Sequence, residues 1–249
     1  MGRIVVIGGL NMDLHLFDLH ASAGQAPLLV ERHHAEPGGK GGNVARAAAR
    51  LGGDVLLVAC VGNDEFGRDC AAAVEADGVD IAGVTVAPDD ATGFVAIELV
   101  GGKHRSLVFA PGANERLSWA GIEPHLAGLG PDDVVIVQAE IPQDALSAVA
   151  ASLTDRHVPL FLDPAPPERV RRGHLAAAEV VTPDLVEAAQ LVGRVPGSEL
   201  WARLAARELL ELGARRVIIK TEASGALLAD RGGMMQVPTL PVEVLDETG

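Results

Sequence analysis

The chain has 249 residues, of which 48% are hydrophobic and 22% charged, and these proportions exclude general disorder. Its formal net charge is −14 at pH 7 and aromatic residues make up only 3% of it. Nucleic-acid binding is therefore excluded as a function, because it needs basic tracks and stacking side chains.

Strand-like and helix-like segments alternate along the chain. Near-continuous apolar runs, as in strands covered on both faces, occupy residues 4–7, 55–59, 134–137, 159–162 and 217–220. Segments with helical periodicity occupy residues 43–51, 65–76, 143–154, 184–191 and 199–212. This alternation predicts an α/β fold in which helices cover both faces of a mostly parallel sheet.

Two stretches interrupt the alternation, at about residues 14–36 and 93–110. The second reads as two strands around a Gly101-Gly102 turn, and the first lacks helical periodicity. Together they predict a small second sheet inserted into a single domain that spans residues 1–249. We expect this sheet to expose the apolar side chains of Phe94, Val95, Ile97 and Leu99, and a second copy of the chain to cover them.

The N-terminus and the cysteines indicate the cellular compartment. Residues 4–7 already form a strand-like run, so we expect no signal peptide, and no apolar run reaches the length of a membrane span. Cys60 and Cys70 have neither disulfide nor metal spacing and are expected to be free and buried. The sequence predicts a soluble cytoplasmic protein without membrane partners.

Asn11 and Asp13 follow the first predicted strand with a spacing of two. In extended backbone this spacing points both side chains the same way, at the end of the strand where ligands of open α/β sheets bind. An amide and a carboxylate suit the recognition of hydroxyl groups. The alternative is an Asx-type turn that caps the strand.

A glycine-rich segment, Pro37-Gly38-Gly39-Lys40-Gly41-Gly42-Asn43, precedes the helix predicted at residues 43–51. Its glycines would allow a ligand to lie against the backbone at a helix N-terminus. The segment is not a Walker A loop, and the Gly8-Gly9 pair does not complete a Gly-x-Gly-x-x-Gly pattern. The alternative is a flexible connector.

Asp184 and Glu187 lie three residues apart at a predicted helix start, so they share a face. Their carboxylates could hold Mg²⁺, directly or through its waters. They could equally cap the helix and interact with its dipole.

These motifs, taken in order, resemble those of the PfkB, or ribokinase-like, family of carbohydrate kinases. The resemblance begins with Asn11-Met12-Asp13 and the glycine-rich segment. It continues through Gly62-Asn63-Asp64-Glu65-Phe66-Gly67, Pro111-Gly112-Ala113-Asn114, Gln138-Ala139-Glu140-Ile141-Pro142, Asp163-Pro164-Ala165-Pro166, Thr182-Pro183-Asp184-Leu185-Val186-Glu187 and Asp246-Glu247-Thr248-Gly249. It implies a three-layer α/β/α domain with a small β-sheet lid, formed by the two irregular stretches.

The resemblance also implies the activity and the site residues. It implies transfer of the γ-phosphoryl group of ATP to a sugar hydroxyl, with Mg²⁺ and possibly a monovalent cation such as K⁺, and a ribose-like sugar as substrate. The residues that would hold the sugar are Asn11, Asp13, Gly39, Lys40, Asn43 and Glu140. Those at nucleotide positions would be Asp184, Thr221, Glu222, Gly225, Asp246, Thr248 and Gly249, with Asp184 and Glu187 at the Mg²⁺ positions.

Two departures from the family pattern affect the expected activity. Asp184 stands where the family has Asn, which adds a negative charge beside the triphosphate. The final signature, D-x-T-G-A-G-D in the family, stops at Gly249, before the Asp that serves as catalytic base. We therefore expect the 249-residue form to be inactive. The alternatives are a non-catalytic sugar-binding or regulatory protein, and a nucleoside kinase.

Overall fold

The structure is a computed structural model that describes residues 2–17, 29–100, 103–195, 199–221 and 224–240. Its strands are β1 (Ile4–Ile7), β2 (Asn11–Phe17), β3 (Arg32–Gly38), β4 (Val55–Gly62), β5 (Asp80–Ala87), β6 (Gly93–Val100), β7 (Lys103–Ala110), β8 (Val134–Gln138), β9 (Leu160–Asp163), β10 (Val180–Val181), β11 (Arg216–Lys220), β12 (Ala226–Asp230) and β13 (Gly233–Val237). Its helices are α1 (Lys40–Arg50), α2 (Glu65–Ala76), α3 (Trp119–Leu126), α4 (Gln143–Arg156), α5 (Arg172–Ala177), α6 (Leu185–Leu191) and α7 (Glu199–Glu211), and 3₁₀ turns lie at Gly112–Arg116 and Pro167–Arg169.

The main sheet has the strand order β13-β12-β11-β10-β9-β8-β1-β4-β5. Neighbouring strands from β5 to β11 pair in parallel, whereas β12 and β13 are antiparallel additions at one edge. Ile7 at the end of β1 lies beside Val58 of β4 and Val137 of β8. The predicted α/β fold is confirmed, and the carboxyl ends of its parallel strands meet at one edge.

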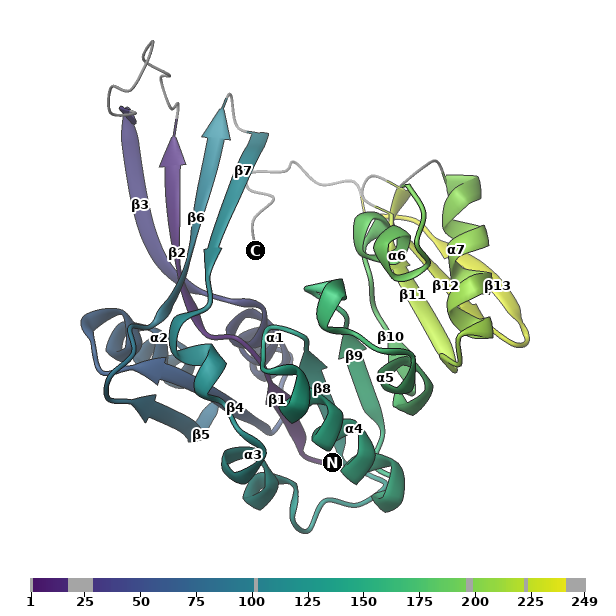
Figure 1. Cartoon of the computed structure of the whole chain (residues 1–249), viewed down its shortest axis with the longest axis horizontal. Helices are drawn as coiled ribbons and strands as arrows, with labels where there is room; N and C mark the ends of the chain where they lie inside the picture. The colour runs from purple at the N-terminus through teal and green to yellow at the C-terminus, as the bar shows by residue number, and fades with distance from the viewer. Residues whose placement is uncertain (1, 18–28, 101–102, 196–198, 222–223, 241–249) are drawn as a thin grey trace.

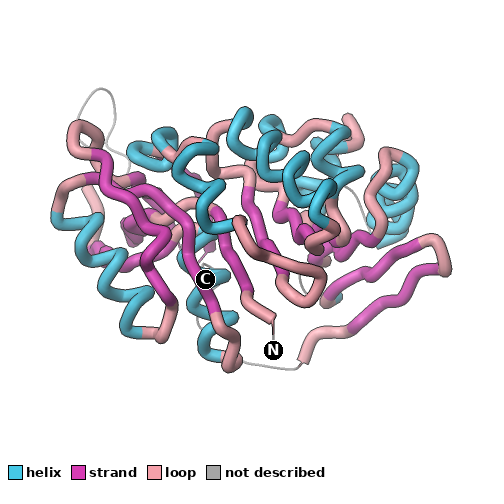
Figure 2. The backbone as a smooth tube through the Cα atoms, turned by 90° about the horizontal axis from the view of Figure 1, so that it is seen from below, coloured by secondary structure: helices cyan, strands magenta, loops and turns pink. Residues whose placement is uncertain are grey.

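Two layers of helices cover this sheet (Figures 1 and 2). Helices α3 to α7 contribute to a continuous core on one face, where Ile7, Ile122 and Leu209 are fully buried. Helices α1 and α2 form a second core with the other face, around Leu57 and Val74. In the described part of the chain this second layer extends over β8, β1, β4 and β5 and not over β10 to β13.

The second sheet has four strands in the order β3-β2-β6-β7 and stands away from the main sheet (Figure 1). Both irregular stretches contribute strands to this small sheet, as the predicted fold requires; residues 18–28 of the first stretch and the Gly101-Gly102 turn lie outside the described residues. The predicted apolar surface was partly wrong, because Ile97 and Leu99 are buried, with 4% and 7% exposure. The exposed apolar side chains lie instead on β7, at Leu107, Val108 and Phe109.

Asp64 connects the start of α2 to the start of the second sheet. Its carboxylate accepts hydrogen bonds from the N–H of Gly67 at 2.8 Å and from the N–H and hydroxyl of Thr92 at 2.8 and 2.6 Å. Burial works to raise the pKa of Asp64, but the Thr92 and Gly67 hydrogen bonds outweigh it and lower that pKa. Asp64 is thus the N-cap of α2 and also fixes Thr92, the residue that precedes β6.

Cys60 and Cys70 are free and buried, as predicted. The thiol of Cys70 donates to the Asn11 carbonyl at 3.1 Å, and burial raises its pKa to about 12. It is therefore a protonated packing group beneath β2.

Among the described residues, none of the helices has the length and apolar character needed to cross a bilayer.

Candidate active site

Asn11 and Asp13 lie at the beginning of β2, just after β1 ends, and both are buried. They are part of a strand, so the alternative of an Asx turn does not hold. The Asn11 Oδ1 accepts a hydrogen bond from Asn114 Nδ2 at 2.7 Å, and Asn114 Oδ1 in turn accepts from the Leu10 N–H at 3.1 Å. Asn11 Nδ2 and Asp13 Oδ1 are buried without a hydrogen-bond partner, so each can still bind a ligand group.

The glycine-rich segment is the junction between β3 and α1, and its geometry explains its composition. Gly39 has a φ of +83°, which favours glycine, and it precedes a helix whose first amides, of Gly41 and Gly42, donate to the Gly9 carbonyl at 2.9 and 3.2 Å. A Cβ at Gly41 would lie 2.7 Å from the Gly8 carbonyl carbon. The glycines therefore admit the chain's own β1–β2 connection, and the alternative of a flexible connector does not hold.

Asp13 faces this junction. A Cβ on Gly38 would overlap with the Asp13 carboxylate, and the Gly39 backbone donates a hydrogen bond to it. Burial raises the pKa of Asp13 to about 6, while His15 and Gly39 act in the opposite direction. Asp13 is thus a buried carboxylate that can change its charge near neutral pH.

Glu140 follows β8 and lies on the opposite side of the same junction. It is 9% exposed, its Oε2 has no hydrogen-bond partner, and a Cβ on Gly9 would overlap with that atom. Burial raises the pKa of Glu140 to about 7, and Asp13 adds to this effect while Lys40 opposes it. The structure therefore brings Asn11, Asp13, Lys40 and Glu140 together. Asn43 lies in the first turn of α1, where it is half-buried.

Lys40 joins these groups to a second set of charges. Its Nζ lies 3.2 Å from Glu187 Oε1 and 3.6 Å from Asp163 Oδ1. Lys220 Nζ contacts the other oxygen of each carboxylate, at 3.4 Å from Asp163 Oδ2 and 3.9 Å from Glu187 Oε2. Burial lowers the pKa of Lys40, but Asp163 and Glu187 outweigh this effect and raise it overall, so Lys40 stays charged.

The family resemblance placed the Asp163-Pro164-Ala165-Pro166 segment at a strand end that lines the sugar and nucleotide clefts, but neither Asp163 nor Lys220 was among the predicted site residues. Each is the last residue of a strand, β9 or β11, and the carboxyl ends of parallel strands collect polar groups at one edge of a sheet. That position was the signal that could have identified both residues.

Asp184 and Glu187 form a capping box at the start of α6. Asp184 Oδ1 accepts from the Glu187 N–H at 2.7 Å, and Glu187 Oε2 accepts from the Asp184 N–H at 2.8 Å. Capping, one of the two interpretations of this pair, is what the structure contains. No group of three or more His, Cys, Asp or Glu side chains able to hold a metal ion occurs in the part of the chain that the structure describes.

Thr221 and Gly225 close the turn between β11 and β12. The Thr221 N–H and hydroxyl donate to the Gly225 carbonyl at 2.7 and 2.9 Å, and Gly225 has a φ of +90°. A Cβ on Gly225 would overlap with the Val237 carbonyl. The structure thus gives both residues a role in the turn. Four residues expected at nucleotide positions, Glu222, Asp246, Thr248 and Gly249, lie outside the described residues.

The fold and this site define a class of protein: a parallel α/β sheet with a small lid sheet, and paired carboxylates and lysines at the carboxyl ends of its strands. The chain matches the family model described as pfkB family carbohydrate kinase over residues 1–249 and belongs to that family.

Individual relatives are more specific. The chain is 31% identical over 250 residues to the ribokinase of Bacillus subtilis, a match that covers 100% of the chain and 82% of that protein. It is 30% identical over 249 residues to a bifunctional ribokinase/ribose-5-phosphate isomerase A of Fructilactobacillus sanfranciscensis; it spans 46% of that longer protein. The structure of Arabidopsis thaliana ribokinase complexed with ribose and ATP has the same fold, with a TM-score of 0.84 at 23% identity over 100% of this chain and 82% of that one.

Proposed function

We propose that this chain provides the substrate sites of an ATP-dependent carbohydrate kinase, which transfers the γ-phosphoryl group of ATP to a hydroxyl group of a ribose-like sugar. The observation that carries the proposal is a group of buried polar atoms without partners: Asn11 Nδ2, Asp13 Oδ1 and Glu140 Oε2. A buried polar atom without a partner destabilises the fold by roughly 1–3 kcal/mol. A ligand with several hydroxyl groups would satisfy all three atoms.

The hydrogen-bonding chemistry of these groups suits a neutral sugar. A carboxylate accepts from a hydroxyl, whereas the Asn11 amide can donate to one. Asp13 and Glu140 face the site from β2 and from the end of β8, so hydroxyl groups on different carbons could be bound at once. The names of relatives support a ribose-like sugar, because the similar proteins described above are ribokinases.

The second set of charges suits the other substrate. Mg²⁺ is usually bound by one or two carboxylates together with substrate phosphates. The carboxylates of Asp163 and Glu187 each contact both Lys40 and Lys220, and their side chains are 15% and 10% exposed. This pair of carboxylates fits that donor set. When bound, Mg²⁺ would neutralise charge on the transferred phosphoryl group. Asp184 would act mainly by holding Glu187 in place through the capping box.

Calorimetric titration tests this function through binding, without requiring turnover. We expect the chain to bind ribose more tightly than glucose and to bind Mg-ATP separately. Asp13→Ala should weaken the binding of ribose, and Asp132→Ala, at an exposed acidic residue before the amino end of β8, is the matched control. Binding of ribose without any binding of Mg-ATP would support instead a non-catalytic sugar-binding protein. Tight binding of Mg-ATP with no affinity for any sugar would contradict the proposal.

We also propose that the protein is a cytoplasmic homodimer that pairs through the lid sheet. Leu107, Val108 and Phe109 on the edge strand β7 are 60%, 59% and 38% exposed, and such edges are commonly covered by a partner. The two free thiols are typical of a reducing compartment. Light scattering should give a dimer mass for the protein and a monomer mass for Val108→Glu, and a monomer in both cases would contradict this.

A further inference from the structure

The strand pair β2–β3 of the lid sheet carries a cluster of four titratable side chains. Asp13 and His15 share a face of β2 because they are two residues apart, and His34 and Glu36 share a face of β3 for the same reason. The antiparallel register places Asp13 opposite Glu36 and His15 opposite His34. Two carboxyl groups and two imidazoles are therefore neighbours on the face that also carries Asn11.

Glu36 contacts both histidines of this cluster. Its Oε1 lies 3.1 Å from His15 Nε2, and its Oε2 lies 3.5 Å from His34 Nε2. Like charges directly opposite each other in a sheet are destabilising, and Glu36 lies directly opposite Asp13. The contacts with the imidazoles offset this repulsion between the two carboxylates.

The cluster has a buried end and an exposed end. Asp13 is 9% exposed and the His15 side chain 3%, whereas the side chains of Glu36 and His34 are 48% and 61% exposed. The His15 ring also stacks beside Phe17, with 6.3 Å between the ring centroids. Water screens buried charges less than exposed ones, so His15 acts on Asp13 more strongly than His34 does.

His15 and Glu36 act on Asp13 in opposite directions. Burial is the main influence on the pKa of Asp13 and raises it to about 6. His15 lowers this pKa, because a positive charge nearby favours the ionised carboxylate, and Glu36 raises it. The charge of Asp13 near neutral pH therefore depends on its neighbours in the lid.

Three further titratable groups surround the same junction. Cys70 of α2 stays protonated, because burial raises its pKa to about 12, and Lys40 of α1 stays charged. Glu140, after β8, changes its charge near pH 7, because burial raises its pKa to about that value. Substitutions within the lid cluster leave all three groups in place, so a change that these substitutions cause is assigned to the cluster.

We propose that His15 is a positioning residue of the sugar site, which acts through Asp13 by keeping it ionised and so sets the pH below which sugar affinity falls. This inference rests on the proposed kinase function. An ionised carboxylate is an acceptor at both oxygens, whereas the protonated form has lost part of that capacity. Sugar binding should therefore be strongest where Asp13 is ionised.

Carbon-detected NMR titration of the ligand-free protein tests the effect on Asp13 directly. The Asp13 carboxyl resonance is assigned with Asp13→Asn and followed from about pH 4 to about pH 8. We expect His15→Gln to raise the titration midpoint by on the order of 0.5 pH unit and Glu36→Gln to lower it. His33→Gln, at an exposed histidine on the other face of β3, is the matched control and should not move it. An unchanged or lower midpoint in His15→Gln would overturn the proposal.

Calorimetry with ribose connects this titration to binding. His15→Gln should weaken ribose binding by about threefold at pH 5, where Asp13 is mostly protonated, because a midpoint raised by about 0.5 unit reduces the ionised fraction by that factor. At about pH 8 the substitution should leave the affinity unchanged, because Asp13 is ionised in both proteins. A merely structural role of His15 would weaken binding equally at both pH values, and that result would overturn the proposal.

The two proposals fail in different ways. If the unaltered protein binds neither ribose nor any other sugar, the proposed function and the role of His15 are both overturned. If it binds ribose and the Asp13 midpoint is the same in His15→Gln, only the role of His15 is overturned. If His15→Gln does not fold, Glu36→Gln decides, since Glu36 is half exposed. A midpoint that does not fall in Glu36→Gln would then overturn the proposal.

Discussion

Strands β4 and β12 belong to the same sheet but are packed differently. Every residue of β4 is buried, because α1 and α2 cover one of its faces and the α3–α4 layer covers the other. In β12 only Leu227 and Ala229 are buried, on the face covered by α6 and α7. In the described residues, the part of the sheet around β1 and β4 is therefore covered by helices on both faces. The part that contains β11, β12 and β13 is covered on one face only.

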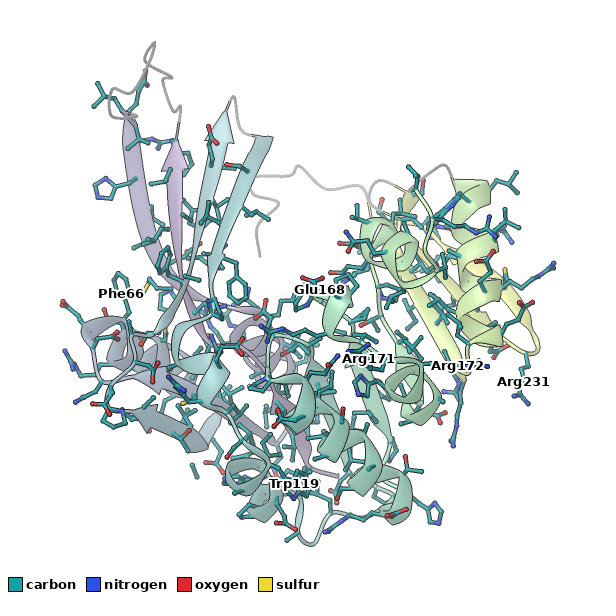
Figure 3. The ribbon with its side chains drawn as sticks, viewed as in Figure 1. Phe66, Trp119, Glu168, Arg171, Arg172 and Arg231 are labelled. Carbon is teal, nitrogen blue, oxygen red and sulfur yellow. The ribbon has the colours of Figure 1, made fainter. Side chains whose placement is uncertain are left out.

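The less covered face is apolar and concave. A groove of about 580 Å³ lies there, lined by Phe161, Ile218, Leu228 and Met235 among others. Arg231, labelled in Figure 3, marks the turn between β12 and β13 at its edge. Apolar side chains on this face contribute less to stability than those of β4, because they remain in contact with water.

The candidate site follows the same division. On the side of β1, β2 and β8, Asp13 and Glu140 are buried, lack partners for one oxygen each, and have raised pKa values. On the side of β9 and β11, Asp163 and Glu187 are paired with lysines. The first arrangement leaves polar atoms available for neutral hydroxyl groups, whereas in the second the charges of two lysines and two carboxylates balance one another.

The largest expected effect tests the packing difference. Leu57→Ala, in the part of the sheet covered on both faces, should lower the free energy of unfolding by about 2–5 kcal/mol, because it removes a fully buried side chain and leaves a cavity. Leu228→Ala, on the less covered face, should lower it by less than about 1 kcal/mol. Urea unfolding measures both. Equal losses would mean that both faces are covered to the same extent.

The raised pKa of Glu140 should make stability depend on pH. The unfolded chain loses this proton near pH 4.5 and the folded chain near pH 7, so between these values the unfolded state binds fewer protons. The free energy of unfolding should therefore fall as pH rises from about 4.5 to about 7, by on the order of 3 kcal/mol. Because the pKa of Asp13 is also raised, to about 6, Glu140→Gln should remove only part of this fall, chiefly the part between about pH 6 and pH 7. An unchanged profile in this variant would assign the titration to another group.

Asp13→Ala tests the sugar side by binding. We expect it to weaken the binding of ribose by roughly 1–3 kcal/mol, the range for leaving buried hydroxyl partners unpaired. The binding of Mg-ADP should not change, because Asp13 is not part of the Asp163–Glu187 pair and its two lysines. Calorimetry on both ligands gives the answer, and unchanged ribose affinity would return Asp13 to a structural role in β2.

The smallest effect concerns the capping box. Asp184→Ala should lower the free energy of unfolding by about 1 kcal/mol, because the Glu187 N–H loses its acceptor. Asp184→Asn keeps an acceptor and should change stability by less than about 0.5 kcal/mol. Thermal unfolding compares the two variants. An equal loss in both would show that charge, and not the cap, stabilises α6.

Prediction from sequence succeeded where the signal was local. Helix α2 spans the predicted residues 65–76, and its start follows from the Asp64 carboxylate, which caps it. Prediction from sequence missed strands β5 and β13, because their short segments contain polar residues and glycine. These segments are strands because β4 and β12 present unpaired edges to them, which is information outside their own sequence.

Local sequence patterns were enough to predict the alternation of strands and helices, the small second sheet, and the glycine-rich segment at the start of α1. These features depend on side-chain periodicity and on local backbone conformation, which neighbouring residues set. Two features follow only from the folded chain: Lys40 and Lys220 share the carboxylates of Asp163 and Glu187, and burial raises the pKa of Glu140 to about 7. Ion pairing and desolvation depend on groups distant in the chain, because electrostatic energies are set by distance and burial in the folded molecule.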